Sequence, residues 1–300
     1  MTGGASGALT PSEVETSFLD ACRAEINALK PGNVHVYADG HGMEVHHFVE
    51  SAKAAAPFIA DRRLKVGERV LGAVAASVAA AGCNTNLGIV LLCAPLAVAA
   101  ETADASQTLR DRLAAVLAEL DHRDAEEVFA AIRTANPGGL SRVSKGDVML
   151  PPTISLLDAM GLAAERDRIA KAYITGFEEI FDDALPVLRQ AAERAPVPDL
   201  AITTLHMHLL AAAPDSHVAR KFGSEVAAGV QQEAAALRAA WHPVTTARSF
   251  NRLIAFDTAL KVRGLNPGTT ADLVVACLFA DALERRLAVS RATQPTCPKS

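Results

Sequence analysis

Apolar residues recur every three to four positions through most of the chain, a spacing typical of amphipathic helices. The capping box Thr10-Pro11-Ser12-Glu13 predicts the start of a first helix that reaches about Leu29. Further helices are predicted over 44–60, 66–81, 86–101, 106–120, 125–135, 154–161, 165–181, 184–193, 200–213, 224–240, 246–262 and 269–288. Because nothing alternates with the period of a strand, we expect an all-α fold. It should form one compact domain of about a dozen helices over residues 10–289, with flexible segments at 1–9 and 290–300.

Composition excludes several classes of protein. Half of the residues are hydrophobic, which is ample for a core, and the net charge of −5 without a Lys or Arg run argues against nucleic-acid binding. The apolar stretch 70–100 is long enough for a membrane span, but Asn84, Thr85 and Asn86 interrupt it. Two buried helices that meet at a polar turn are therefore expected. Five cysteines without CxxC spacing and the lack of a secretory signal point to the cytoplasm.

Four polar turns contain residues that a simple connector between apolar helices would not need: KPGNV at 30–34, GCNTNLG at 82–88, PDSHVARK at 214–221 and RGLNPGTTAD at 263–272. In the first, Gly32 lets backbone N–H groups approach an anion and Lys30 offers a positive charge, although an ordinary helix stop explains the same residues. In the second, Asn84 or Thr85 is suited to capping a helix whose free N–H groups also attract phosphate.

The third and fourth turns also have two interpretations each. Asp215, His217 and the cations Arg220 and Lys221 fit either a solvated helix start or a binding site. Asp272 stands in the first turn of a helix, where the helix dipole favours it and where it could also hold a cation. We expect all four turns to line one pocket.

Other motifs in the sequence add little information about function. The stretch 136–152, with three prolines and three glycines around Ser141, Lys145 and Asp147, could be an active-site loop. The histidines show no HExxH spacing, which argues against a zinc site. A Walker A loop, a GxSxG elbow and a dinucleotide fingerprint are also missing, so any ATP site belongs to an unusual fold.

In order and spacing, the series KPGNV, CNTNLG, DSHVARK and GLNPGTTADL resembles the motifs of the triphosphoribosyl-dephospho-CoA synthase family, from about Ala21 to Leu283. The family's motifs read approximately KPGLV, GVNTHKG, DTNVLRRGG and GGSADLL. Asp39 and His41 are the nearest counterparts of an acid and a histidine that follow the first motif. The chain departs from the second motif, because Asn86 and Leu87 replace its histidine and lysine.

The resemblance implies an all-helical, Mg²⁺-dependent enzyme that transfers the 5-triphosphoribosyl group of ATP to a hydroxyl of dephospho-CoA and releases adenine. The product would be a precursor of the prosthetic group of citrate or malonate decarboxylase-type lyases. Asp215 and Asp272 are assigned to Mg²⁺ binding or acceptor activation, and His41 is a further catalytic candidate. The residues assigned to ATP and its phosphates are Lys30, Gly32, Asn33, Asn84, Thr85, Asn86, Gly88, Arg220, Lys221, Asn266 and Gly268.

Two alternatives stay open at this point. A related transferase could use a ribosyl or ribityl acceptor in tetrahydromethanopterin-type C1-cofactor biosynthesis, because the changed second motif bears on the substrate. A non-catalytic helical scaffold that keeps the pocket ranks last, since a scaffold would not need four polar turns. The expected partners are small molecules, with neither nucleic acid nor membrane, and a homodimer is left open.

Overall fold

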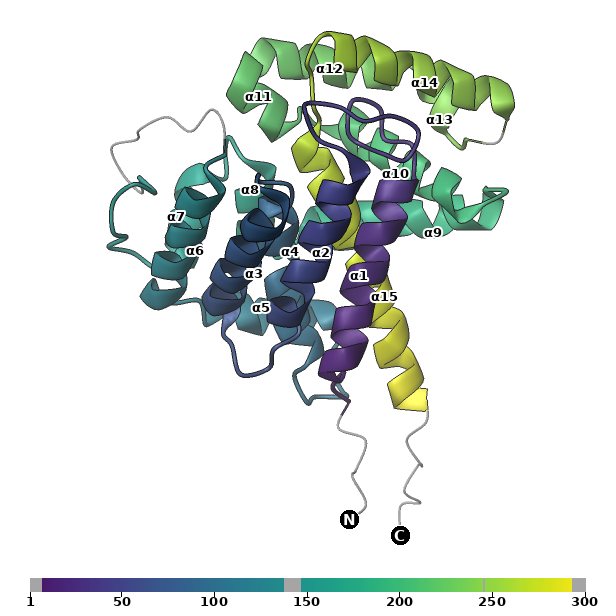
Figure 1. Cartoon of the computed structure of the whole chain (residues 1–300). Helices are drawn as coiled ribbons and strands as arrows, with labels where there is room; N and C mark the ends of the chain where they lie inside the picture. Colours follow the sequence, from purple (N-terminus) through teal and green to yellow (C-terminus); the bar gives the residue numbers. More distant parts are fainter. Residues whose placement is uncertain (1–6, 138–146, 245, 293–300) are drawn as a thin grey trace.

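The computed structural model describes residues 7–137, 147–244 and 246–292, and the predicted ends at 1–6 and 293–300 lie outside this range. Within it the all-α prediction is confirmed, with fifteen α-helices, one π-helical turn and no sheet (Figure 1). The elements are α1 (Pro11–Asn27), α2 (Val45–Ile59), α3 (Val66–Ala81), α4 (Leu87–Ala100), α5 (Leu109–Ala118), α6 (His122–Ala135), α7 (Leu156–Ala163), α8 (Arg168–Ile174), η1 (Glu179–Ala184), α9 (Leu185–Arg194), α10 (Pro198–Ala212), α11 (Ser216–Phe222), α12 (Ser224–Ala236), α13 (Arg238–Trp241), α14 (Ala247–Val262) and α15 (Gly268–Ala292).

Local capping signals place several helix ends. The Thr10 hydroxyl oxygen accepts a hydrogen bond from the Glu13 N–H, and the Glu13 carboxylate accepts one from the Thr10 N–H, so the predicted capping box is confirmed. The predicted continuous helix 165–181 is wrong. The chain leaves α8 at Ile174 and passes through Gly176 and Phe177, whose φ angles of 60° and 59° cannot continue a right-handed helix, before η1 begins.

The core forms around α4 and α15. Helix α4 is buried on nearly every side, as its apolar sequence requires, and it packs against α3, α5 and α15. Helix α15 also packs against α1 and α10, so the chain's first and last described helices lie side by side (Figure 1). A second, smaller apolar cluster joins α10 to the layer α11–α14. Among the described helices, none has both the length and the apolarity that crossing a membrane requires.

Candidate functional site

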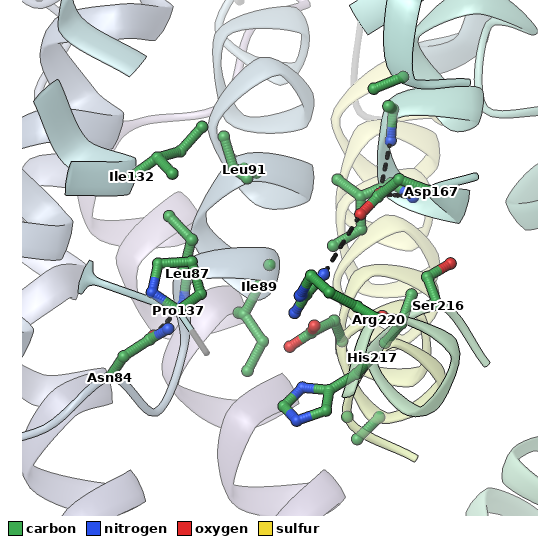
Figure 2. A pocket seen from close by; sticks show the side chains of 18 of the residues that line it. Asn84, Leu87, Ile89, Leu91, Ile132, Pro137, Asp167, Ser216, His217 and Arg220 are labelled. Atoms are coloured by element: carbon green, nitrogen blue, oxygen red, sulfur yellow. Dashed lines mark hydrogen bonds and ion pairs between the residues drawn. The ribbon is translucent and has the colours of Figure 1, made fainter. Parts of the chain in front are cut away.

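A cavity of about 550 Å³ opens where the four polar turns meet. Each turn contributes side chains to its lining, for example Asn33, Asn84, His217 and Asp272. Figure 2 shows the polar residues Asp167, Ser216, His217 and Arg220 on one side of this cavity and apolar residues from α4 and α6 on the other. Turns separated by more than 200 residues therefore build one site, as the sequence predicts.

Side-chain hydrogen bonds tie three of the turns together. The Asn33 amide donates to Asn266 Oδ1 at 2.8 Å and so joins the first turn to the fourth. Asp215 joins the third turn to the fourth, since its Oδ2 accepts from both the N–H and the hydroxyl of Thr270 at 2.7 and 2.8 Å. Both contacts are buried, which makes them strong and fixes the relative positions of the turns.

The second turn meets the fourth through Gly88 and Asp272. A Cβ atom placed on Gly88 would lie 2.1 Å from Asp272 Oδ2, so only glycine lets this carboxyl group approach the N-terminus of α4 so closely. Asp272 lines the cavity, and no hydrogen bond to its carboxyl group is found among the described residues. Burial, together with the nearby carboxyl group of Asp215, raises its pKa well above the ordinary range.

Asp215, the other predicted catalytic carboxylate, is fully buried and does not line the cavity. Besides Thr270, it receives hydrogen bonds from the N–H groups of His217 and Val218 at 2.9 and 3.0 Å, so it caps α11. Four donors occupy its two oxygens. In this arrangement Asp215 holds two turns together, and its assignment as a metal ligand or catalytic group stays a prediction.

The cation of the first turn does not reach the cavity. Lys30 is completely buried, forms an ion pair with Glu25 and donates to the Val34 carbonyl at 2.7 Å. Its charge is therefore neutralised inside the protein, and it is Glu25 that lines the cavity. Lys30 therefore does not line the cavity, and its assignment to phosphate binding stays a prediction.

The glycine of the first turn is also internal. Gly32 has a φ of 87°, and its N–H donates to Asp257 Oδ1 at 2.8 Å. A Cβ there would lie 2.6 Å from Pro267 Cδ, so this position packs directly on the fourth turn. Asp257, which also contacts His35 at 3.2 Å and Lys261 at 3.1 Å, is an organising residue that the turn patterns do not reveal.

Three further predicted residues lie outside the lining. The His41 ring nitrogen Nε2 is 2.8 Å from the Gly32 carbonyl, so His41 braces the first turn from behind. Asn86 is buried and donates to Ser77 Oγ at 2.9 Å. Lys221 is exposed on α11. These positions follow from local packing that spacing in the sequence cannot show.

The second turn does face the cavity. Asn84 Oδ1 accepts from the Leu87 N–H at 3.2 Å and so caps the start of α4, while the Thr85 hydroxyl donates to Ser51 Oγ at 2.6 Å. Both residues line the cavity, as do Leu87 and Gly88. The N-terminus of α4, with its positive end of the helix dipole, therefore points at the site.

The cations of the cavity are arginines. Arg220 lines it and pairs with Asp167 at 3.6 Å, and Asp167 in turn caps α8. Arg166 lines it from the loop between α7 and α8, where its guanidinium donates to the Leu162 carbonyl at 3.1 Å. The sequence interpretation misses Arg166 and Asp167 because they lie in none of the four turns.

His217 sits on the same wall with an incomplete set of hydrogen bonds. Its Nε2 is buried without a partner among the described residues, and a Cβ on Gly268 would come within 2.9 Å of its Nδ1. Burial, and next the charges of Arg220 and Lys221, lower its pKa to about 3, so the ring is neutral at physiological pH. Asn266 and Gly268 line the cavity beside it.

The acidic groups of the lining do not form a metal cage alone. Among the described residues there is no group of three His, Cys, Asp or Glu side chains placed to hold a metal ion. Ser141 and Lys145, from the predicted loop, lie outside the described residues. Asp147 is described, does not line the cavity, and accepts from the Met149 N–H at 2.9 Å.

Comparison with known proteins agrees with the motifs. A search of curated proteins finds no match to this chain. A crystal structure from Archaeoglobus fulgidus, provisionally assigned as a triphosphoribosyl-dephospho-CoA synthase, matches with a TM-score of 0.59 and 27% sequence identity over 78% of this chain and 97% of that one. The model of the family ATP:dephospho-CoA triphosphoribosyl transferase (CitG) matches residues 11–291. Since this match spans nearly the whole chain, the protein belongs to the ATP:dephospho-CoA triphosphoribosyl transferase family.

Proposed function

We propose that this chain transfers the 5-triphosphoribosyl group of ATP to a hydroxyl of dephospho-CoA and releases adenine. One observation carries the assignment: the family's four motif turns converge on a single cavity, and the Asp272 carboxyl group faces that cavity. The comparisons favour neither a C1-cofactor transferase nor a non-catalytic scaffold. The cytoplasmic location and a homodimer stay predictions.

The reaction exchanges one bond at the anomeric carbon of ATP for another. The bond between C1′ and adenine N9 breaks, a bond from C1′ to the acceptor oxygen forms, and the proton lost by the acceptor hydroxyl balances the proton gained by adenine. Positive charge develops on the ribose as the base departs, and a carboxylate nearby stabilises it. The site therefore needs an anionic group that can also take a proton.

Asp272 meets both requirements. Its carboxyl group reaches the cavity between the N-termini of α4 and α15, and burial raises its pKa. A carboxylate with a raised pKa is a stronger base and so suits removal of the acceptor's proton near neutral pH. We assign acceptor activation to Asp272, and we assign Asp215 the task of holding the third and fourth turns around it.

Phosphate binding falls to the arginines and the second turn. Arg220 and Arg166 offer guanidinium groups to the phosphates of the two substrates, and the N-terminus of α4 adds its dipole. The described lining also carries three carboxyl groups, those of Glu25, Asp167 and Asp272, so protein cations alone cannot neutralise a triphosphate.

This charge balance fits a divalent cation bound together with ATP. Mg²⁺ is normally held by one or two carboxylates plus substrate phosphates, so the lack of a three-residue metal cage in the described part of the chain does not conflict with it. Of the two predicted ligands, Asp272 has oxygens that face the cavity, and those of Asp215 are occupied. When bound, the ion would neutralise phosphate charge.

The decisive assay incubates the pure protein with ATP, Mg²⁺ and dephospho-CoA, then measures free adenine and the triphosphoribosylated product. Asp272→Asn should lower kcat by about 10²-fold or more. Asp20→Asn, an exposed position outside the cavity, is the matched control and should leave kcat unchanged. No adenine release by the wild type under any metal condition would refute the proposed function.

Two further measurements separate the roles of the carboxylates. Asp215→Asn should lower both kcat and stability because it disturbs four buried hydrogen bonds, whereas Asp272→Asn should lower kcat alone. A Mg²⁺ titration of Asp272→Asn distinguishes its two possible functions. If Asp272 is the base, the substitution should remove the pH dependence of kcat without changing the Mg²⁺ requirement. If Asp272 is a metal ligand, the substitution should raise the Mg²⁺ concentration needed for half-maximal rate.

A further inference from the structure

The half of the cavity farther from the four turns has a different chemical character. It lies between α4, α6, α7 and α8, and Figure 2 shows Leu91 and Ile132 on this side, away from Asp167 and Arg220. We call it the apolar arm, and its lining consists of Leu91, Val128, Phe129, Ile132, Leu156, Ala159, Met160, Ala163 and Ala170. None of these side chains carries a polar atom that could hydrogen-bond a ligand strongly.

The backbone around the arm also offers few free hydrogen-bond donors or acceptors. The lining residues belong to helices whose N–H and C=O groups are mostly paired within the helix. The Tyr173 hydroxyl, which lies behind α4, is committed to the Leu91 carbonyl at 2.6 Å. The arm is therefore suited to a part of the ligand that forms few hydrogen bonds, because polar groups buried there would remain unpaired.

Two substrate parts compete for this space under the proposed function. The adenine of ATP has ring nitrogens and an amino group around its edge, and each needs a partner when it is buried. The pantetheine part of dephospho-CoA ends in a mercaptoethyl group and carries two methyl groups on one carbon, which need none. The methyl groups lie next to the diphosphate, and a hydroxyl and two amides lie between them and the thiol. This chain is flexible, so its amides can turn toward the polar wall, the side of the cavity that carries Asp167, Ser216, His217 and Arg220.

The position of Arg166 favours the same occupant. This exposed arginine lies on the loop that joins α7, a wall of the arm, to the N-terminus of α8, which belongs to the polar wall. In dephospho-CoA a diphosphate separates the ribose from pantetheine. The order of groups along this substrate is ribose, diphosphate and pantetheine. Along the cavity the corresponding order is polar turns, Arg166 and apolar arm.

We propose that the apolar arm binds the pantetheine part of the acceptor and that Arg166 contacts the acceptor's diphosphate. This inference rests on the proposed function for the identity of the acceptor. It concerns residues outside all four motif turns. Leu87, which stands in place of the family motif's lysine, also lines the cavity and gives the second turn an apolar side chain.

The test uses calorimetric titrations of the full-length protein with dephospho-CoA, pantetheine and adenosine. Ile132→Asn introduces an amide into the arm at a half-buried position, and Ile174→Asn, on the exposed side of α8 outside the cavity, is the matched control. Ile132→Asn should weaken dephospho-CoA and pantetheine by roughly tenfold and leave adenosine unchanged, the usual scale for a misplaced group in an apolar pocket. The control should change none of the three affinities.

Other results would overturn the proposal. If Ile132→Asn weakens adenosine and spares pantetheine, the arm holds the donor base. Equal affinities in Ile132→Asn and the wild type would show that the arm binds neither part. Because these titrations need no turnover, they separate the two hypotheses: normal binding without adenine release refutes the proposed reaction, and adenine release with no effect of Ile132→Asn refutes the arm assignment.

Discussion

The contact between Gly88 and Asp272 offers a direct test of the site, through the substitution Gly88→Ala. The new methyl group would lie 2.1 Å from Asp272 Oδ2 and 2.7 Å from Ile169 Cδ1, whereas ordinary contacts begin near 3.4 Å. Either the carboxyl group or the start of α4 must therefore move by about 1.3 Å. A displacement of about 1 Å in a catalytic group can reduce turnover about 10²-fold, and we expect a loss of kcat of this size.

The stability of Gly88→Ala should change much less. Overpacking a buried site costs about 1–3 kcal/mol, and replacing a helical glycine by alanine returns about 1 kcal/mol, so the free energy of unfolding should fall by about 0–2 kcal/mol. Gly229→Ala is the matched control. A Cβ on Gly229, within α12, meets nothing within 4 Å. That variant should be slightly stabilised and fully active.

Adenine release and urea unfolding, measured on both alanine variants, check this reasoning. A Gly88→Ala protein with wild-type kcat would show that the close approach of Asp272 to α4 has no role in catalysis. A loss of several kcal/mol of stability together with a loss of activity would show instead that Gly88→Ala disrupts the fold. The role of Asp272 in catalysis would then have to be tested with Asp272→Asn alone.

Three further predictions concern charge. Lys30→Met should destabilise the fold by about 3–5 kcal/mol in urea unfolding, because it leaves Glu25 buried without its partner. Adding Glu25→Gln should recover most of that loss. A much smaller effect of Lys30→Met would show that water solvates the pair. Burial lowers the pKa of His206 to about 3, whereas an unfolded histidine titrates near 6.5, so the unfolded chain binds more protons between these values and stability falls as the pH falls. From pH 7 to pH 5 this residue alone should remove about 2 kcal/mol, and a His206→Leu variant with the same pH slope would contradict the assignment. Leu87→Lys should lower the KM for ATP in the adenine assay, since it places a cation beside the start of α4, and an unchanged KM would separate Leu87 from donor binding.

Local signals predict the helices well because capping and turn residues act within a few positions. Thr10 caps α1 through Glu13, three residues away. The break after α8 is different, because Phe177 adopts a positive φ although its side chain gives no sign of it. Tertiary packing imposes that conformation, since Phe177 is completely buried in the main core.

The site itself is predictable only in part. The four turns can be recognised from their residues, but the orientation of each side chain depends on distant partners. Asp215 is bound by Thr270, 55 positions later, and this removes it from the cavity, whereas Asp272 faces it. Arg166 could not be recognised from the sequence because an exposed arginine between two helices is common, and only the fold places it on the lining of the same cavity as Arg220.

The amide pair of Asn33 and Asn266, 233 positions apart, has a consequence for biosynthesis. The cavity is lined by segments that lie more than 200 positions apart in the chain. A ribosome-bound chain that stops before Gly268 lacks Asp272 and the helix that packs on α1 and α4, so it has no completed pocket. Contacts of such long sequence separation slow folding. Nascent chains of this protein should therefore acquire nucleotide affinity late and abruptly, when α15 leaves the ribosome and docks.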